Sequence, residues 1–121
     1  MKFIIRMGVP EMEDLWKNLC KKSKEGTLKG YDKKLLKKLA KVLRFLQSDP
    51  KYPGLRTHEI NILSKKYGIK VWQSYLENNT PSAGRLFWVY GPERKDITII
   101  GIEPHPEDKK DAYEKIRLSS L

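Results

Sequence analysis

The residues of this chain best suited to chemistry lie in one stretch near its C-terminal end, residues 84–113. Arg85 carries a planar guanidinium, whose fork of N–H donors suits a phosphate. His105 titrates near neutral pH, and the prolines on either side of it stiffen its backbone. Glu103 comes two residues earlier and would point to the same side if a strand continued there. A cation beside a proton-transfer group suits acid–base chemistry on an anion. The structural alternatives are an arginine that caps the end of a sheet and a histidine that follows the end of a strand.

Two strands must position these side chains. Arg85 opens the apolar run of residues 86–90, a polar turn occupies residues 91–96, and a second apolar run covers residues 97–102. Both runs are short and rich in β-branched or aromatic residues, and neither alternates cleanly. This pattern predicts central strands that are covered on both faces. A six-residue connection predicts a hairpin, which would place Arg85 and the Glu103–His105 segment at the same end of the sheet.

The rest of the chain predicts an α+β order of strand, two helices, a meander of four strands and a terminal helix. We expect a strand at residues 3–7 and a helix that opens with Pro10 and ends at Gly26. A linker follows, and Asp32 is the expected N-cap of a second, strongly amphipathic helix that ends near residue 48. We then expect an edge strand at residues 55–60, a turn at 65–68 and another strand at 69–76. A loop at residues 78–84 leads to Arg85, and a polar helix carrying Tyr113 is expected beyond residue 106.

Length and composition predict a single domain over residues 1–121. Hydrophobic residues make up 39% and charged residues 33% of the chain, which is typical of a globular protein with a highly charged exterior. No apolar run approaches the roughly 20 residues that span a bilayer, and the first residues do not resemble a signal peptide. The single cysteine, Cys20, allows no internal disulfide and is expected to be a packing residue. A cytoplasmic location without membrane association is the resulting expectation.

The net charge of +10 is concentrated in one segment. Residues 17–44 contain eleven Lys or Arg and only two acids, Glu25 and Asp32. A solvated helical surface would explain such a segment. We favour an electrostatic footprint for an acidic partner, most often nucleic acid or an acidic protein.

Four short motifs in order give the chain a family resemblance. They are LRTHEI at residues 55–60, VWQSY at 71–75, RLFWVY at 85–90 and IIGIEPH at 99–105, and they follow a basic helical hairpin. This combination resembles the RelE/ParE superfamily, the toxins of type II toxin–antitoxin pairs. The resemblance implies a curved, mostly antiparallel sheet of four to five strands, with the N-terminal strand and helical hairpin packed on it and a short C-terminal helix.

For the RelE-like branch, the resemblance implies metal-independent, ribosome-dependent cleavage of messenger RNA with no cofactor. In such cleavage the 2′-hydroxyl attacks its own 3′-phosphate, which needs a base, an acid and positive charge on the phosphorane. Arg85 would supply the charge, and His105 and Tyr113 would supply acid, base or stacking roles. Tyr113 comes eight residues after His105, so which of the two occupies the catalytic position stays open. Tyr113 could also simply pack its helix on the sheet.

Further residues are candidates for RNA contacts. They are the arginine and histidine of the LRTHEI motif, two cations of the hairpin turn and two lysines near Tyr113, namely Arg56, His58, Arg94, Lys95, Lys109 and Lys110. Trp88 is expected in the core and Trp72 either in the core or in base stacking. The chain has no ligand-spaced cluster for a metal, no phosphate-binding glycine loop and no serine nucleophile elbow.

Two other functions remain open from the sequence. One is a ParE-like, non-enzymatic inhibitor of DNA gyrase, and the other is a non-toxic nucleic-acid or protein-binding module. Under the toxin readings, the expected partners are messenger RNA, the ribosome and an acidic antitoxin that is encoded nearby and folds on binding.

Overall fold

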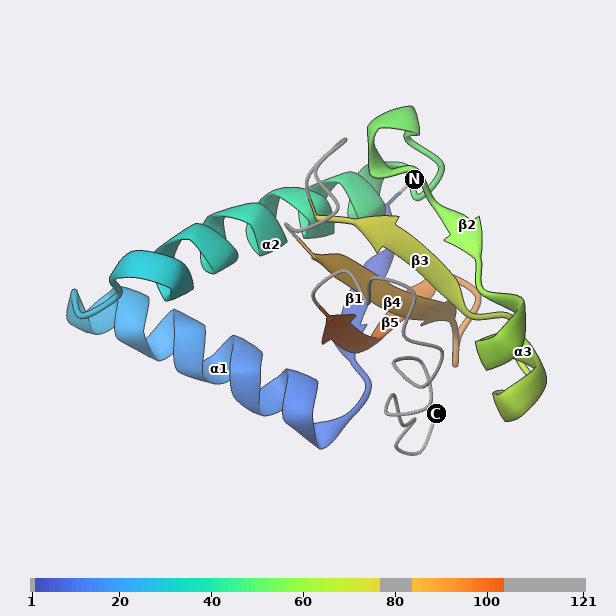
Figure 1. Cartoon of the computed structure of the whole chain (residues 1–121), viewed down its shortest axis with the longest axis horizontal. Coiled ribbons are helices and arrows are strands. Elements are labelled where there is room, and N and C mark those ends of the chain that lie inside the picture. Colours follow the sequence, from blue (N-terminus) through green and yellow to red (C-terminus); the bar gives the residue numbers. More distant parts are fainter. Residues whose placement is uncertain (1, 77–83, 104–121) are drawn as a thin grey trace.

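The computed structural model describes residues 2–76 and 84–103. This part of the chain is a small α+β domain with three α-helices and a five-stranded, mostly antiparallel sheet (Figure 1). Its elements in order are β1 (Ile4–Met7), α1 (Pro10–Glu25), α2 (Gly30–Ser48), the short 3-10 helix η1 (Pro53–Leu55), β2 (His58–Glu59), α3 (Asn61–Tyr67), β3 (Trp72–Tyr75), β4 (Arg85–Tyr90) and β5 (Asp96–Glu103). The expected C-terminal helix lies outside the described residues.

The strand order is β1-β5-β4-β3-β2, so the four later strands form the predicted antiparallel meander. Strand β1 returns to the sheet beside β5 and runs parallel to it, with Ile4 opposite Asp96. The two helices between β1 and β2 provide the length that such a parallel connection needs. Every residue from Arg85 to Val89 is buried, which confirms the prediction that β4 is covered on both faces.

The helical hairpin follows the sequence signals closely at three of its four ends. Helix α1 begins at Pro10 and ends before Gly26, which adopts the left-handed conformation of a C-cap. Helix α2 ends at Ser48 as expected. The prediction that Asp32 caps α2 is wrong, because the helix already begins at Gly30. The Asp32 carboxylate instead accepts a hydrogen bond from Lys22 of α1 at 3.1 Å, an ion pair that joins the two helices.

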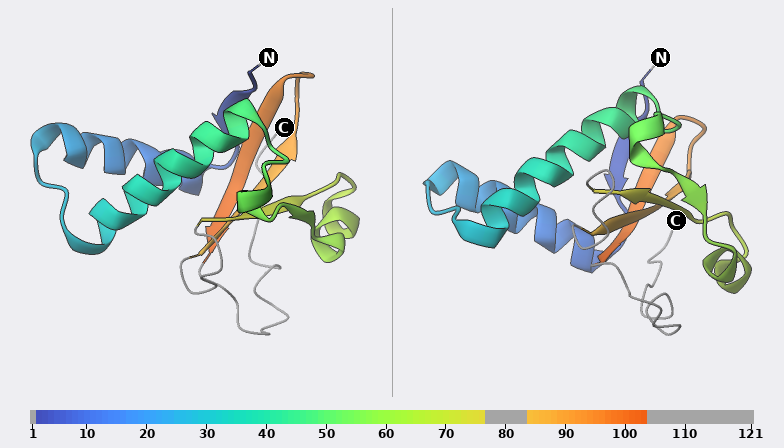
Figure 2. Two further views of the ribbon diagram at one scale, coloured as in Figure 1. Left: turned by 90° about the horizontal axis from the view of Figure 1, so that it is seen from above. Right: turned by 45° about the horizontal axis from the view of Figure 1, so that its top comes forward.

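Helices α1 and α2 cover one face of the sheet with their apolar stripes. The cluster between the helices and the sheet includes Met12, Leu19, Leu35, Leu39, Val42, Leu43 and Leu46 from the helices and Leu76, Leu86, Trp88, Ile97 and Ile99 from the strands. Trp88 is fully buried, as expected. The hairpin extends well beyond the sheet, and its α1–α2 connection lies far from the strands (Figure 2). The basic residues of this segment therefore lie partly on a projecting arm.

The opposite face of the sheet carries a smaller apolar cluster, formed with α3. Leu63 of α3 packs with Val71, Phe87, Val89 and Ile100. The prediction of a turn at residues 65–68 is wrong, because residues 61–67 form this helix and Gly68 is its left-handed C-cap. The chain therefore places helices on both faces.

The predicted strand at residues 55–60 is mostly wrong. Residues Pro53–Leu55 form η1, and Arg56 follows in the left-handed region at φ 48°. Only His58 and Glu59 pair with β3. Their position at the end of the strand order confirms that this segment forms the sheet edge. Among the described residues, no helix is long and apolar enough to cross a membrane.

Candidate functional site

Arg85 begins β4 and is only 7% exposed. Its backbone pairs with Glu103 of β5 on one side and with Tyr75 of β3 on the other. This register confirms the prediction that the start of β4 and the end of β5 lie at the same end of the sheet. His105 and Tyr113 lie outside the described residues, as do Lys109 and Lys110.

The Arg85 guanidinium is held by two residues of β3. Its Nη1 donates a hydrogen bond of 2.8 Å to the Gln73 side-chain oxygen, and this bond is buried. Its central carbon lies 5.5 Å from the centre of the Tyr75 ring, within the range of a cation–π interaction. A bond to a charged donor is roughly twice as strong as a neutral one, so these contacts restrain the position of the guanidinium.

Gln73 extends this contact to the sheet edge. Its amide nitrogen lies 3.2 Å from His58 Nε2, and His58 Nδ1 lies 2.9 Å from the Arg56 carbonyl oxygen. Because Arg85 can only donate, the Gln73 oxygen must accept, and its NH2 group then faces His58. His58 Nε2 accepts this hydrogen bond, and Nδ1 carries the proton that goes to the carbonyl. We call Arg85, Gln73 and His58 the charged series.

This arrangement defines what each member can do. Both ring nitrogens of His58 are engaged, so His58 can transfer a proton only by breaking a hydrogen bond. The contacts of His58 therefore support a role in positioning Gln73. The guanidinium, with its orientation set in advance, is suited to stabilising negative charge on a substrate.

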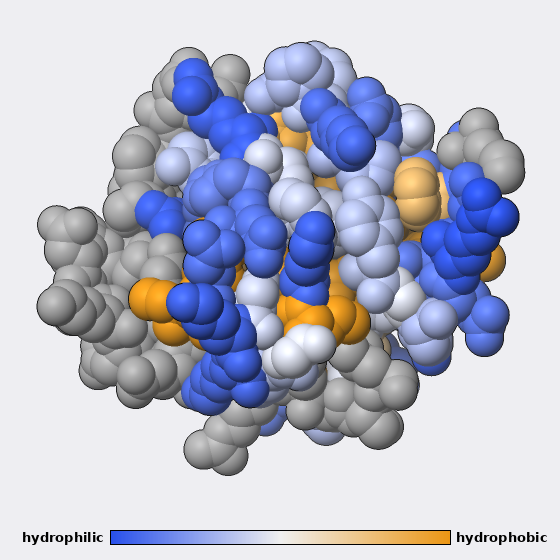
Figure 3. Space-filling view, turned by 90° about the vertical axis from the view of Figure 1, so that its right-hand side faces the viewer, coloured by the Kyte–Doolittle hydropathy of each residue, from blue (hydrophilic) through white to orange (hydrophobic). Residues whose placement is uncertain are grey.

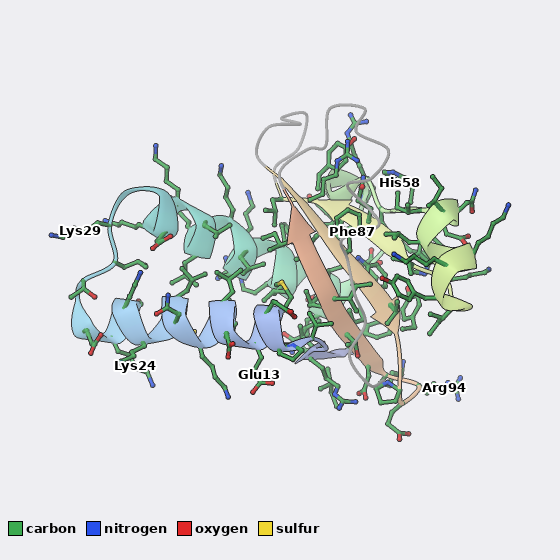
Figure 4. All side chains as sticks on the ribbon, turned by 60° about the horizontal axis from the view of Figure 1, so that its bottom comes forward. Glu13, Lys24, Lys29, His58, Phe87 and Arg94 are labelled. Atoms are coloured by element: carbon green, nitrogen blue, oxygen red, sulfur yellow. The ribbon has the colours of Figure 1, made fainter. Side chains whose placement is uncertain are left out.

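The charged series lies on the face of the sheet that α1 and α2 do not cover. Gln73 and Arg85 alternate along their strands with Trp72, Ser74 and Leu86, and Gln73 is directly opposite Phe87 of the α3 cluster. Figure 4 shows His58 and Phe87 on the same half of the molecule, with Arg94 at the other end of the sheet.

A second series of hydrogen bonds crosses the other face of the same strands. Trp88 Nε1 donates to Ser74 Oγ at 2.9 Å, and Ser74 Oγ lies 2.7 Å from Thr57 Oγ1. Thr57 donates its own proton to the Pro50 carbonyl at 3.0 Å, so Ser74 must donate to Thr57. We call Trp88, Ser74 and Thr57 the neutral series.

The predicted contact residues of the β4–β5 turn, Arg94 and Lys95, do not lie near Arg85. Arg94 is exposed in the β4–β5 turn, and Lys95 lies 5.2 Å from the centre of the Phe3 ring. Arg56 is exposed next to the edge strand, and His58 belongs to the charged series. The structure thus brings His58 and Arg85 into one network through Gln73 and leaves Arg94 and Lys95 at the far end of the sheet.

Sequence reasoning missed Gln73, Ser74 and Tyr75 as partners. The available signal was two adjacent polar residues inside the otherwise apolar β3 segment, both of which are fully buried. Buried polar side chains need partners, so they mark strand positions where the neighbouring strands supply hydrogen bonds. Within residues 2–76 and 84–103, no three His, Cys, Asp or Glu side chains gather as metal ligands would.

Comparisons with known proteins add no relative. A scan against protein-family models, a search of curated proteins and a search of solved structures each found no match.

Proposed function

We propose that this chain is a RelE-like toxin that cleaves messenger RNA without a metal, acting on the ribosome to inhibit translation. The observation that carries the proposal is Arg85, which opens β4 opposite the end of β5 with its guanidinium held by Gln73 and Tyr75. The arrangement of the fold, with a helical hairpin on one face and Arg85 on the other, is compatible with the expected RelE/ParE-like domain.

In the proposed reaction, the 2′-hydroxyl of the message attacks the adjacent phosphate and the 5′-oxygen leaves. Arg85 stabilises the charge that develops on the phosphorane, and the contacts that hold its guanidinium reduce the reorganisation needed at that moment. His105 and Tyr113 remain the candidates for the base and the acid. His58 is proposed to contact the RNA beside Arg85, because the charged series ends at its side chain.

The proposal includes an acidic antitoxin as the cellular partner. The support is the density of lysines on α1 and α2 and the projection of this hairpin beyond the sheet (Figure 2). An acidic segment that folds on binding would neutralise such an arm.

The test is inducible expression in a bacterial host, with primer extension on a reporter transcript. We expect growth arrest and new 5′ ends inside translated codons for the unsubstituted chain. Arg85→Ala should abolish both, and Arg85→Lys should lose most cleavage because an ammonium lacks the planar fork. The charge-matched control is Lys65→Ala, which removes one exposed cation from α3.

Because Arg85 is buried, the folding of each variant must be checked by thermal unfolding of the purified chain. A folded Arg85→Ala variant that still cleaves would refute the assignment of Arg85. Arrest with intact transcripts would instead support gyrase inhibition, and the absence of arrest would support a binding module.

A further inference from the structure

A groove on the face of the sheet that α1 and α2 cover combines aromatic and cationic side chains. Its volume is about 780 Å³, within the range of roughly 300–1,000 Å³ that is typical of ligand sites. It lies between the segment before β2 and the strands β3 and β4, and its lining includes Tyr52, Trp72, Trp88 and Tyr90 together with Lys51, Arg56 and Lys70.

The aromatic floor of this groove is a packed unit. The Trp72 and Trp88 rings are stacked with centres 6.2 Å apart, and Tyr90 meets both edge-on. Within this cluster Trp88 is fully buried, whereas Tyr90 is 37% exposed. Tyr52, on the facing segment, is 41% exposed and stacks on Phe45 of α2 at 4.4 Å. The groove therefore offers aromatic rings that are already held in place.

The rim is fixed to this floor by the neutral series. Thr57 lines the groove and is bonded through Ser74 to the Trp88 indole. Thr57 also anchors the Pro50 carbonyl, so the chain that carries Lys51, Tyr52 and Arg56 is held against the sheet at both of its ends. Such a preformed site avoids much of the entropy cost of ordering on binding.

The charged side chains that line the groove favour an anionic ligand. Each charged residue of its lining is basic, and the ion pairs found within the described residues do not involve Lys51 or Lys70. Burial, and then the charge of Asp49, raise the pKa of Tyr90, so the Tyr90 hydroxyl remains protonated. The Trp72 indole N–H is buried beside the groove without a hydrogen-bond partner in the part of the chain that the structure describes.

We propose that this groove binds single-stranded RNA, with a nucleobase against Tyr90 and Tyr52 and the flanking phosphates on Lys51, Arg56 and Lys70. Aromatic faces with cations around them fit an unstacked base and its backbone. Hydrophobic residues reach the surface only in small separate areas on the side of the molecule that carries α3 and β2 (Figure 3). The site is separate from Arg85, which lies on the other face, and the inference does not require that the chain cleave RNA.

The experiment measures fluorescence anisotropy of a labelled 2′-O-methyl oligouridine of about eight nucleotides, a length within the range of known single-strand sites. This probe lacks the attacking hydroxyl and cannot be cleaved. The double variant Lys51→Gln/Lys70→Gln should weaken binding and lower the slope of log K against log salt by about 0.7 for each phosphate that is no longer neutralised. The matched control is Lys2→Gln/Lys65→Gln, which removes two exposed cations elsewhere and should retain the affinity and slope.

The stacking component is tested with Tyr90→Leu and Tyr90→Phe. Removing the ring should weaken binding by roughly 5- to 150-fold, whereas the phenylalanine variant should bind like the unsubstituted chain. An equal loss of RNA affinity in the Lys51/Lys70 and Lys2/Lys65 double variants would overturn the proposal. So would folded Tyr90→Leu and Tyr90→Phe variants that bind the RNA equally well. A Tyr-containing oligoglutamate peptide that binds in a Tyr90-dependent way, where the RNA does not, would assign the groove to an acidic protein and also overturn it. None of these readouts uses growth or cleavage, so they separate this inference from the proposed nuclease.

Discussion

The charged and neutral series cross the same three segments on opposite faces of one sheet. Each begins on β4, passes through adjacent residues of β3 and ends on a backbone carbonyl of residues 50–56. The neutral series begins at an indole N–H and contains only hydroxyls between that donor and the carbonyl. The charged series begins at a guanidinium and contains an imidazole.

This difference shows how one sheet can have a structural face and a candidate reactive face, although the hydrogen bonds on both faces join the same three segments of the chain. Hydrogen bonds among uncharged groups, buried at Trp88 and partly buried at Thr57, hold the edge segment to the core. The same path, when it begins with a permanent cation, also positions a positive charge, which the proposed reaction would use at the phosphate. The position of a series in the fold therefore does not show whether its role is structural or reactive. The side chain on β4 with which the series begins, a neutral indole or a cationic guanidinium, makes the difference.

The largest effect on stability should come from breaking the charged series at its centre. Gln73→Met keeps a side chain of similar length and removes the acceptor of Arg85 and the donor to His58. Because a hydrogen bond to a charged group contributes about 1.5–3 kcal/mol, we expect the free energy of unfolding to fall by about that amount. Urea unfolding of the purified chain measures it.

The same Gln73→Met variant also tests the proposed function. If Gln73 orients Arg85, cleavage should fall while the protein still folds, because the guanidinium keeps its charge and loses the hydrogen bond that positions it. Full cleavage by a destabilised Gln73→Met chain would make the charged series a purely structural feature.

Breaking the neutral series should have a smaller effect. Ser74→Ala leaves the buried Trp88 N–H and the Thr57 hydroxyl without their shared partner, at a cost of about 1–2 kcal/mol in the free energy of unfolding. Cleavage should be unchanged, since Arg85 lies on the other face. If Ser74→Ala proved as damaging to cleavage as Gln73→Met, the proposed division between the two faces would be wrong.

The sequence predicted the elements on which these series are built, for local reasons. Pro10 and Gly26 mark the ends of α1, and the non-alternating runs at residues 86–90 and 97–102 identify the central hairpin. The juxtaposition of Arg85 with Glu103 followed from the short six-residue connection, which predicted a hairpin. Such features depend on residues close together in the chain, where propensity and pattern are strongest.

The remaining features depend on tertiary contacts. Helix α3 has only seven residues, and it is stabilised by Leu63, which fills a site against Phe87. The pairing of His58 with Gln73 depends on the register of a two-residue edge strand, which no pattern in the sequence fixes. The left-handed Arg56 shortens that strand, and arginine gives no signal of such a conformation. The charged series could therefore not be predicted, although Arg85 could.

The smallest effect on the free energy of unfolding is expected from an exposed ion pair, whose cation, Lys17, is positively charged like Arg85 but lies in solvent. Lys17 and Glu13 pair across one turn of α1 at 2.7 Å, with side chains that are 71% and 51% exposed. The hydrogen bond with Lys17, and then its charge, lower the pKa of Glu13, and the same contacts raise the pKa of Lys17. A lowered carboxyl pKa contributes stability at neutral pH that is lost as the pH falls through the pKa of folded Glu13, and a raised lysine pKa contributes stability that is lost as the pH rises through the pKa of folded Lys17.

We expect Lys17→Gln to leave the urea midpoint nearly unchanged at neutral pH, and any difference to vanish in acid or in high salt, because water and ions screen exposed charges. A large decrease in the urea midpoint that salt does not change would mean that solvent exposure does not decide how much a charge contributes to the stability of this protein. The contrast between buried Arg85 and exposed Lys17 would then need another cause.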